Sequence, residues 1–210
     1  GCPVVFKAHP GHMTTTALVG AALLRAAEKT GMPKGVFNMI YGGIVGAALV
    51  KHPAIQAVGF TGSLRGGRAL CDMAAARPQP IPVFAEMSSI NPVILMPEAL
   101  KARGEKVAGE LAASVVLGAG QFCTNPGLVL GIRSPEFSAF LHSLTAKMAE
   151  QPPQTLLNAG GLEGYGKGIA ALAAHPGITH LAGAAQEGKQ ARPQLFKACL
   201  LYTSPSPRDS

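Results

Sequence analysis

The chain has 210 residues, of which 48% are hydrophobic and 14% are charged. This balance is typical of a globular α/β protein and excludes a disordered or acidic-tail polypeptide. The formal net charge is +7, but the 18 Lys and Arg residues are scattered, and the chain has no Trp and three Tyr. We therefore expect no nucleic-acid partner, and interpret the charge as an attraction for anionic ligands such as a dinucleotide.

The cysteines and the longest uncharged stretch indicate a cytoplasmic protein without a membrane span. The four cysteines lie far apart and match neither a zinc-binding pattern nor a dense disulfide framework, so no metal site is expected. Residues 111–132 carry no charge, but the centre of this stretch, residues 118–127, is polar and helix-breaking.

Both ends of the chain indicate a fragment. The sequence begins inside a predicted strand without an initiator Met, and it ends in a Pro/Ser-rich run. We expect residues 199–210 to be a non-native tail.

Residues 1–88 alternate between predicted strands and helices. Gly31 and Pro33 stop the first helix, and Ser63 is placed as the N-cap of the third. Short crossover helices imply a doubly wound parallel sheet, a Rossmann-like cofactor domain that binds its ligand beyond the carboxyl ends of the strands. The expected strands are 3–7, 36–41, 55–60 and 83–87, and the expected helices are 13–30, 44–51 and 64–76.

A turn at residues 88–92 marks the predicted domain boundary. The alternation then resumes, so residues 89–198 are expected to form a second, truncated α/β domain. No internal repeat is visible. The expected strands are 91–96, 127–132 and one near 178–182, the expected helices are 98–117, 135–150 and one near 168–174, and 118–126 is a loop.

Cys123 lies in this short polar loop between an apolar helix and an apolar strand, where a reacting group is both held and reached. A thiol needs a nearby base or positive end to become a nucleophile, and a single cysteine is more often unreactive. Cys2, Cys71 and Cys199 lie within or beside predicted elements and are interpreted as packing residues.

Glu86 ends an otherwise apolar strand beside the predicted boundary. Burial of a carboxylate there would favour its protonated form and suit it to accept a proton from water. The alternative is an exposed strand-end carboxylate or one paired with an Arg.

A candidate phosphate-binding turn, Thr61-Gly62-Ser63, leads from a predicted strand into a predicted helix that contains Gly67. Free N–H groups at such a helix start suit a phosphate. The full Gly-x-Gly-x-x-Gly spacing is missing, and an ordinary strand-to-helix turn has the same appearance. Lys7, at the end of the first strand, can hydrogen-bond ribose hydroxyls or simply be solvated.

Four segments in this order resemble the aldehyde dehydrogenase superfamily over about residues 1–198. The resemblance implies that Cys123 is the nucleophile, that Glu86 is the base, and that an aldehyde is oxidised to a carboxylic acid through a Cys thioester. It also implies a homo-oligomer and a set of cofactor-binding residues, namely Lys7, Pro10, Thr61, Gly62, Ser63, Gly67 and Met87. The segments are Val4-Val-Phe-Lys7, Phe60-Thr-Gly-Ser63, Glu86-Met-Ser-Ser-Ile-Asn-Pro92 and Gly120-Gln-Phe-Cys123.

Within the superfamily, Glu86-Met-Ser-Ser in place of the commoner Glu-Leu-Gly-Gly is similar to the 2,5-dioxovalerate (α-ketoglutaric semialdehyde) and fatty-aldehyde dehydrogenase branch. The resemblance implies NADP or NAD as the cofactor. Pro10 stands where many NAD-preferring members have a Glu, and the loss of that carboxylate would relieve repulsion of a 2′-phosphate.

Two departures from the family pattern leave alternatives open. The family's oxyanion-binding Asn and its Glu-x-Phe-Gly-Pro motif are absent, and one missing oxyanion donor costs on the order of 10² to 10³ in rate. The alternatives are an inactive dinucleotide-binding fragment and a cofactor-independent thiol hydrolase that pairs Cys123 with His142.

Overall fold

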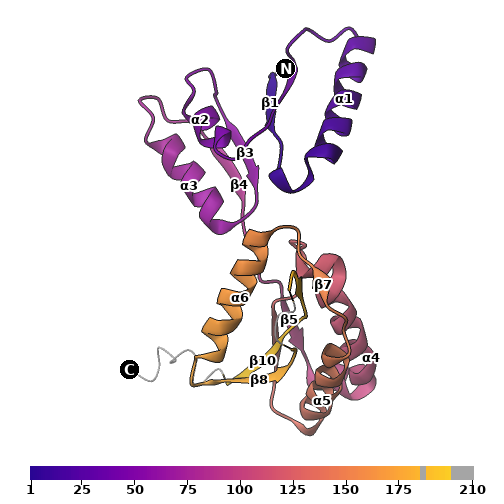
Figure 1. Cartoon of the computed structure of the whole chain (residues 1–210). Coiled ribbons are helices and arrows are strands. Elements are labelled where there is room, and N and C mark those ends of the chain that lie inside the picture. The colour runs from indigo at the N-terminus through magenta and orange to yellow at the C-terminus, as the bar shows by residue number, and fades with distance from the viewer. Residues whose placement is uncertain (185–187, 200–210) are drawn as a thin grey trace. The chain divides into compact units, whose positions relative to one another are not determined.

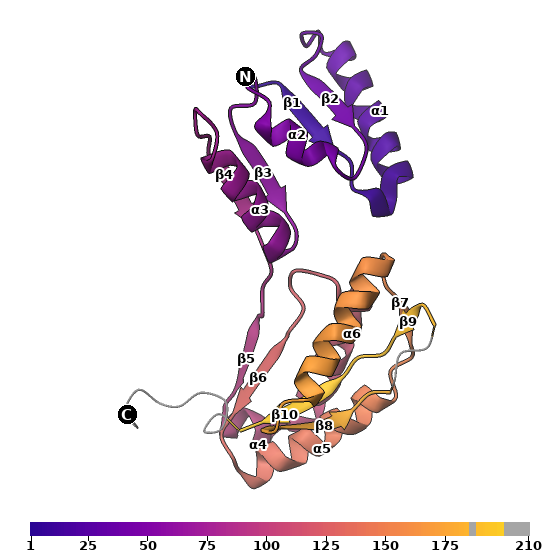
Figure 2. The same ribbon diagram turned by 60° about the vertical axis from the view of Figure 1, so that its left-hand side comes forward.

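The computed structural model describes residues 1–184 and 188–199 and divides into two compact units, Gly1–Ser88 and Ser89–Ser210 (Figures 1 and 2). Each unit is described by itself. Of the expected tail at 199–210, all but Cys199 lies outside the described residues.

The first unit contains two parallel strand pairs, β1–β2 and β3–β4, each connected through a helix. Helix α1 contacts β2 of the first pair, α3 contacts β4 of the second, and α2 packs against α3 (Figures 1 and 2). The elements are β1 Val4–Lys7, the 3-10 helix η1 Pro10–His12, α1 Met13–Lys29, β2 Phe37–Ile40, α2 Val45–Lys51, β3 Val58–Thr61, α3 Leu64–Ala75 and β4 Val83–Glu86.

Local signals explain where these helices begin and end. After α1, the backbone turns at Gly31, whose φ of 68° favours glycine. The predicted N-cap of α3 is confirmed, because the Ser63 hydroxyl accepts a hydrogen bond from the Gly66 N–H at 3.1 Å.

The second unit combines one parallel pair, β5–β6, with two antiparallel pairs, β7–β9 and β8–β10. Helices α4 and α5 lie side by side, and β8 contacts both α5 and α6 (Figure 2). The elements are β5 Pro92–Leu95, α4 Pro97–Val116, the 3-10 helix η2 Leu117–Gly120, β6 Leu128–Gly131, α5 Pro135–Ala149, β7 Gln154–Thr155, α6 Ala159–Ala173, β8 Ile178–Ala182, β9 Gln190–Ala191 and β10 Leu195–Ala198.

The parallel pairs confirm the α/β class, but the described part of residues 154–198 differs from the prediction. Helix α6 begins at Ala159, well before the expected start near 168, because the Asn158 side chain caps Gly161 at 2.8 Å and so starts a helix that its glycines disfavour. Strands β7, β9 and β10 were not expected, and β10 pairs antiparallel with β8 rather than extending a parallel sheet.

The larger hydrophobic core lies in the second unit. Phe140, Leu144 and Met148 occur at every fourth position of α5, so they form one buried stripe that packs against α4. Leu111 of α4 and Ala182 of β8 belong to the same cluster. The first unit has a smaller core around Val50, Ala74 and Ile81.

We expect Leu144→Ala to lower the free energy of unfolding by about 2–5 kcal/mol, because it removes a side chain that is 2% exposed and leaves a cavity in the α4–α5 core. The matched control is Leu172→Ala in α6, where the side chain is 42% exposed and the loss should be far smaller. Urea denaturation measures both values. Equal losses in the two variants would contradict this description of the core.

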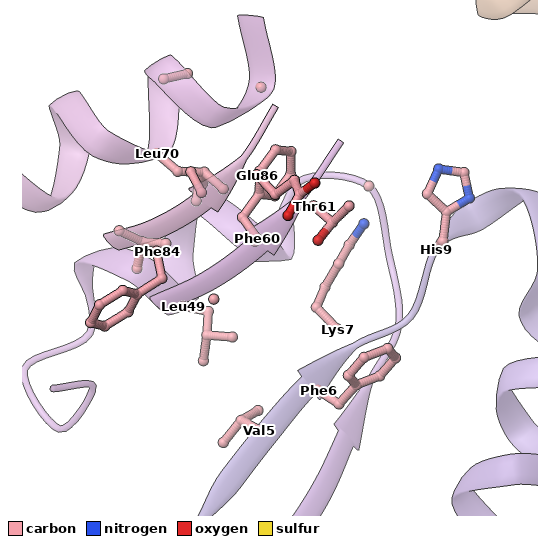
Figure 3. A pocket seen from close by; sticks show the side chains of 18 of the residues that line it. Val5, Phe6, Lys7, His9, Leu49, Phe60, Thr61, Leu70, Phe84 and Glu86 are labelled. Carbon is pink, nitrogen blue, oxygen red and sulfur yellow. The ribbon is translucent and has the colours of Figure 1, made fainter. Parts of the chain in front are cut away.

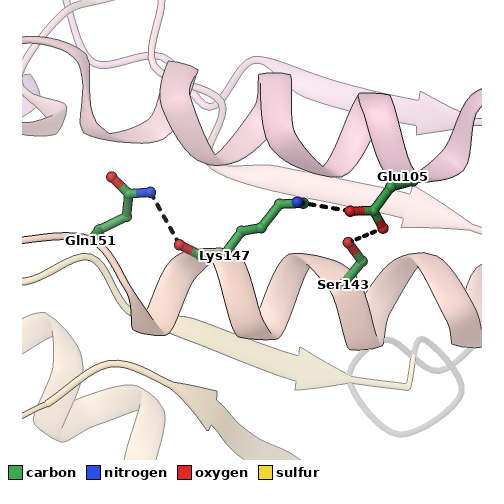
Figure 4. Close-up of polar contacts among 4 residues, drawn as sticks. All are labelled: Glu105, Ser143, Lys147 and Gln151. Carbon is green, nitrogen blue, oxygen red and sulfur yellow. Dashed lines mark hydrogen bonds and ion pairs between the residues drawn. The ribbon is translucent and has the colours of Figure 1, made fainter.

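An ion pair joins the exposed sides of α4 and α5 (Figure 4). The Lys147 ammonium lies 2.8 Å from the Glu105 carboxylate, which also accepts a hydrogen bond from the Ser143 hydroxyl. The hydrogen bond from Lys147, with a smaller one from Ser143, lowers the pKa of Glu105 below its ordinary value. Glu105 in turn raises the pKa of Lys147.

A pH dependence of stability follows from these two pKa shifts. Because the pKa of Glu105 is lower in the folded protein than in the unfolded chain, its ionised carboxylate stabilises the fold. This stabilisation is complete above the pKa that Glu has in the unfolded chain, about 4.3, and is lost as the pH falls through the pKa of Glu105 in the folded protein. The Lys147 contribution to stability is lost as the pH rises through the raised pKa of Lys147.

We expect Glu105→Gln to lower the melting temperature slightly at neutral pH, but to leave it unchanged in acid or at high salt. Glu110→Gln, whose partner Lys106 lies 3.7 Å away with both side chains exposed, should have a smaller effect. A Glu105→Gln difference that persists in acid would contradict this explanation.

Candidate active site

A cavity of about 1190 Å³ opens in the first unit beside the carboxyl ends of its strands (Figure 3). Lys7 ends β1, Thr61 ends β3 and Glu86 ends β4, and all three line this cavity. Thr61 and Glu86 are register partners in the parallel pair. In Figure 3 the Lys7 side chain extends toward Thr61 and Glu86. The structure therefore brings together one cation, one hydroxyl and one carboxylate from three predicted site positions.

Glu86 is exposed, which agrees with the alternative of an exposed strand-end carboxylate and not with a buried one. Exposed and half-buried residues alternate along β4, and Glu86 is one of the exposed residues that line the open cavity. Its backbone carbonyl accepts a hydrogen bond from the Gly62 N–H at 3.0 Å. The main chain at Glu86 is thus tied to the turn after β3 while its side chain stays accessible to water.

The turn at Thr61-Gly62-Ser63 already uses several of its N–H groups within the protein. The Leu64 N–H donates to the Ser88 hydroxyl at 3.2 Å, and Ser63 caps the Gly66 N–H. An anion at this helix start would therefore also rely on the hydroxyls of Thr61 and Ser63 as donors.

The glycines of this region permit close packing. A Cβ on Gly67 would lie 2.5 Å from the Met87 side chain, and a Cβ on Gly62 would lie 2.7 Å from the Phe60 ring. Gly67 and Met87 therefore meet where α3 passes the end of β4.

Two histidines that the sequence interpretation missed line the same cavity. Their rings stack at 5.3 Å between centroids, and His9 caps η1 by accepting the Gly11 N–H at 3.0 Å. Pro10 lies between them at the start of η1 and is exposed. The signal was available as the run Lys7-Ala-His-Pro-Gly-His12, because His9 and His12 follow Lys7 within five positions.

Cys123 lies exposed in the turn that follows η2, within the predicted loop. Three residues shortly before Cys123 have a left-handed backbone conformation, with φ values of 60° at Gly118, 57° at Ala119 and 70° at Gly120. Among the described residues, Ala119 and Asn91 are the non-glycine residues with positive φ. Such backbone strain is concentrated at functional sites, and both residues belong to the segments that hold Cys123.

Side-chain amides hold the Cys123 turn in place. The Asn91 amide reaches the carbonyl oxygens of Cys123 and Asn125, and the Asn125 amide reaches the Val115 carbonyl at 2.7 Å. The Gln121 side chain accepts the Leu157 N–H at 2.9 Å. From sequence, Asn91 was interpreted as part of the turn at residues 88–92 and as the first residue of the strand expected at 91–96.

The other three cysteines were interpreted as packing residues, and this interpretation is wrong for one of them. Cys71 and Cys199 are partly buried, as expected for packing residues. Cys2 is exposed rather than packed, because it precedes β1 and no element covers it among the described residues. His142 lies exposed on α5.

Residues 1–184 and 188–199 offer neither a membrane-spanning helix nor a metal-binding cluster. No helix there is both long and apolar enough to cross a membrane. The same residues contain no group of three or more His, Cys, Asp or Glu side chains arranged to hold a metal ion.

Comparison with known proteins gives one consistent result. The model of the aldehyde dehydrogenase family matches residues 1–157. The alpha-ketoglutaric semialdehyde dehydrogenase of Acinetobacter baylyi is 56% identical over 200 residues, and alpha-ketoglutaric semialdehyde dehydrogenase 2 of Azospirillum brasilense is 50% identical over 201 residues. Each alignment covers 94% of this chain and 38% of the relative, so the chain spans 38% of the length of these proteins.

A solved structure shows the same fold. An NAD-dependent benzaldehyde dehydrogenase from Corynebacterium glutamicum superposes with a TM-score of 0.73, 24% sequence identity, and coverage of 92% of this chain and 43% of that chain.

Proposed function

Because the chain belongs to the aldehyde dehydrogenase family, we propose that its protein oxidises an aldehyde to a carboxylic acid with NADP or NAD, and that the aldehyde is α-ketoglutaric semialdehyde (2,5-dioxovalerate), which yields 2-oxoglutarate. The observation that carries this proposal is the exposed Cys123 in a strained turn fixed by hydrogen bonds. The substrate follows from the names of the two curated relatives. The first unit binds the cofactor and the second supplies the nucleophile.

Cys123 begins the reaction. Its thiolate attacks the carbonyl carbon of the aldehyde, a carbon–sulfur bond forms, and the carbonyl electrons move onto the oxygen. The backbone N–H of Cys123 donates a hydrogen bond to that oxyanion and stabilises the charge that develops there.

The cavity of the first unit fits a dinucleotide. Its volume of about 1190 Å³ exceeds that of most small-molecule pockets, and the polar groups of Lys7 and Thr61 suit ribose hydroxyls and phosphate oxygens. When bound, NAD(P)⁺ would supply the hydride acceptor for the carbon attached to Cys123, so that a thioester could form there. Lys7 and Thr61 hold and orient the cofactor, together with Pro10, Gly62, Ser63, Gly67 and Met87.

Glu86 completes the cycle by releasing the acid. Its carboxylate takes a proton from a water molecule, and the resulting hydroxide attacks the thioester carbon. The carbon–sulfur bond then breaks, the carboxylic acid leaves, and the proton held by Glu86 passes to the departing sulfur, which restores both the Cys123 thiol and the Glu86 carboxylate. The exposure of the Glu86 side chain gives it access to that water.

The test is aldehyde-dependent formation of reduced nicotinamide by the product of the complete reading frame that encodes this chain, with NAD and NADP in parallel. A panel would include α-ketoglutaric semialdehyde, a neutral aldehyde of similar length and a long-chain aldehyde. We expect the highest kcat/KM with the semialdehyde. No reduction with any aldehyde would overturn the proposal.

The same protein distinguishes the two alternatives. A thiol hydrolase using Cys123 and His142 would cleave an ester but form no reduced nicotinamide. A non-catalytic dinucleotide-binding protein would bind NADP or NAD in calorimetry and form no covalent adduct at Cys123 with an aldehyde.

A further inference from the structure

The backbone carbonyl of Cys123 receives two hydrogen bonds from one short segment of chain. The Ser89 hydroxyl donates to it, and the Asn91 amide donates to it at 2.7 Å. A carbonyl oxygen has two lone pairs, so these two donors occupy both. The peptide between Cys123 and Thr124 is therefore held from outside its own loop.

The Asn91 amide is itself fixed in orientation. Besides the Cys123 carbonyl it contacts the Asn125 carbonyl at 2.9 Å and the Ser89 hydroxyl at 3.2 Å. Carbonyl oxygens only accept hydrogen bonds, so the group that faces them must be the NH₂ of the amide. Asn91 also adopts a φ of +47°, a left-handed conformation that asparagine tolerates better than most residues.

A backbone hydrogen bond joins residues 89–91 to the end of the loop that follows Cys123. The Gly127 N–H donates to the Ile90 carbonyl at 2.8 Å. A Cβ on Gly127 would lie 3.1 Å from that carbonyl oxygen, so the two strands of chain run in close contact here. Residues 89–91 thus hold the Cys123 turn both before and after the cysteine.

We propose that Ser89 and Asn91 are positioning residues for the Cys123 nucleophile. Fixing the Cys123 carbonyl fixes the peptide plane that follows the cysteine and so restricts the backbone rotation that would swing its thiol and its N–H away from the substrate. This inference rests on the proposed role of Cys123. The Ser89 hydroxyl adds a second donor to the Cys123 carbonyl beside the Asn91 amide.

Asn91→Gly and Asn91→Asp give the sharpest test. Glycine accepts the positive φ but removes the amide. Because two hydrogen bonds are lost, we expect kcat to fall about 20-fold with little change in KM. Asn91→Asp turns a donor into a carboxylate that faces two carbonyl oxygens, so the loss should be larger. Relative to the unmutated protein at the same pH, its kcat should recover in acid, where the protonated carboxyl can again donate. A merely structural role would not produce that recovery.

Ser89 provides a milder and independent pair of variants. We expect Ser89→Ala to lower kcat about 5-fold, the loss of one neutral hydrogen bond, and Ser89→Thr to restore most of it because the hydroxyl is kept. Hydrogen–deuterium exchange of the peptide that contains residues 118–127 should increase in Ser89→Ala and Asn91→Gly. The matched control is Ser138→Ala, which loses a hydrogen bond to Ser134 on α5 and should change neither kcat nor exchange in that peptide.

The outcomes separate this inference from the proposed function. If Cys123→Ala is inactive while Asn91→Gly and Ser89→Ala both keep kcat within about 2-fold, the positioning role is wrong and the function stands. If exchange in 118–127 increases but Cys123→Ala retains activity, the proposed function is wrong. If Asn91→Gly fails to fold, the Ser89→Ala and Ser89→Thr pair decides the question.

Discussion

Replacing Cys123 with alanine is expected to reduce aldehyde-dependent formation of reduced nicotinamide by at least about 10⁴-fold. The substitution removes the only atom of the proposed mechanism that bonds covalently to the substrate, and no thioester can form without it. Because the Cys123 side chain is exposed, alanine leaves no core cavity, and the hydrogen bonds to its carbonyl come from Ser89 and Asn91. The folded protein and its cofactor affinity should therefore be preserved.

The measurement is the initial rate of reduced nicotinamide formation, with cofactor binding followed separately by calorimetry. Cys2→Ala is the matched control, because Cys2 is the other exposed thiol that the structure describes, and it should leave the rate unchanged. A Cys123→Ala variant that keeps more than about 1% of the activity would contradict the assignment of the nucleophile.

Glu86→Gln is expected to separate the two halves of the reaction. The thioester should still form, giving one burst of reduced nicotinamide, but its hydrolysis should slow by about 10² to 10⁴-fold because glutamine cannot accept the proton of water. The hydrogen bond from Gly62 to this strand end goes to the backbone carbonyl of Glu86, so the substitution leaves it in place.

Rapid-mixing kinetics and mass spectrometry of the trapped protein test this prediction. The burst should equal one reduced nicotinamide per active site, and the mass should show an acyl group on Cys123. Glu28→Gln, at an exposed carboxylate of α1, should turn over normally. Normal acid production by Glu86→Gln would assign the base to another group.

Much of the fold was predictable because its signals are local. The apolar spacing and the stop at Gly31 placed α1, and the Ser63 cap placed α3, within a residue or two of the observed bounds. The β8 strand at Ile178–Ala182 was placed correctly, yet its partner β10 was not anticipated. Strand pairing depends on a segment elsewhere in the chain, and short apolar runs do not identify it.

Some features of the candidate site were also predictable from local sequence signals, and others were not. The run around Cys123 predicted an exposed loop, because glycines and a proline there break both the helix and the strand. The sequence left open whether Glu86 is buried or exposed, because the alternation along β4 shows which residues share a face but not whether that face is covered. Similarly, His9 and His12 gained meaning only when the structure placed them in one cavity with Lys7.

The sequence by itself determined the order of strands and helices up to α5, the α/β class and the loop that contains Cys123, since hydrophobic period, caps and helix breakers act over a few neighbouring residues. Only the tertiary structure decided that the Asn91 amide meets a carbonyl 32 positions away, beside a Ser89 hydroxyl that donates to the same oxygen. Such a meeting depends on the packing of β5 against β6 and on a positive φ at Asn91. Neither the strand pairing nor the positive φ can be predicted from the residue types of Ser89, Asn91 and Cys123.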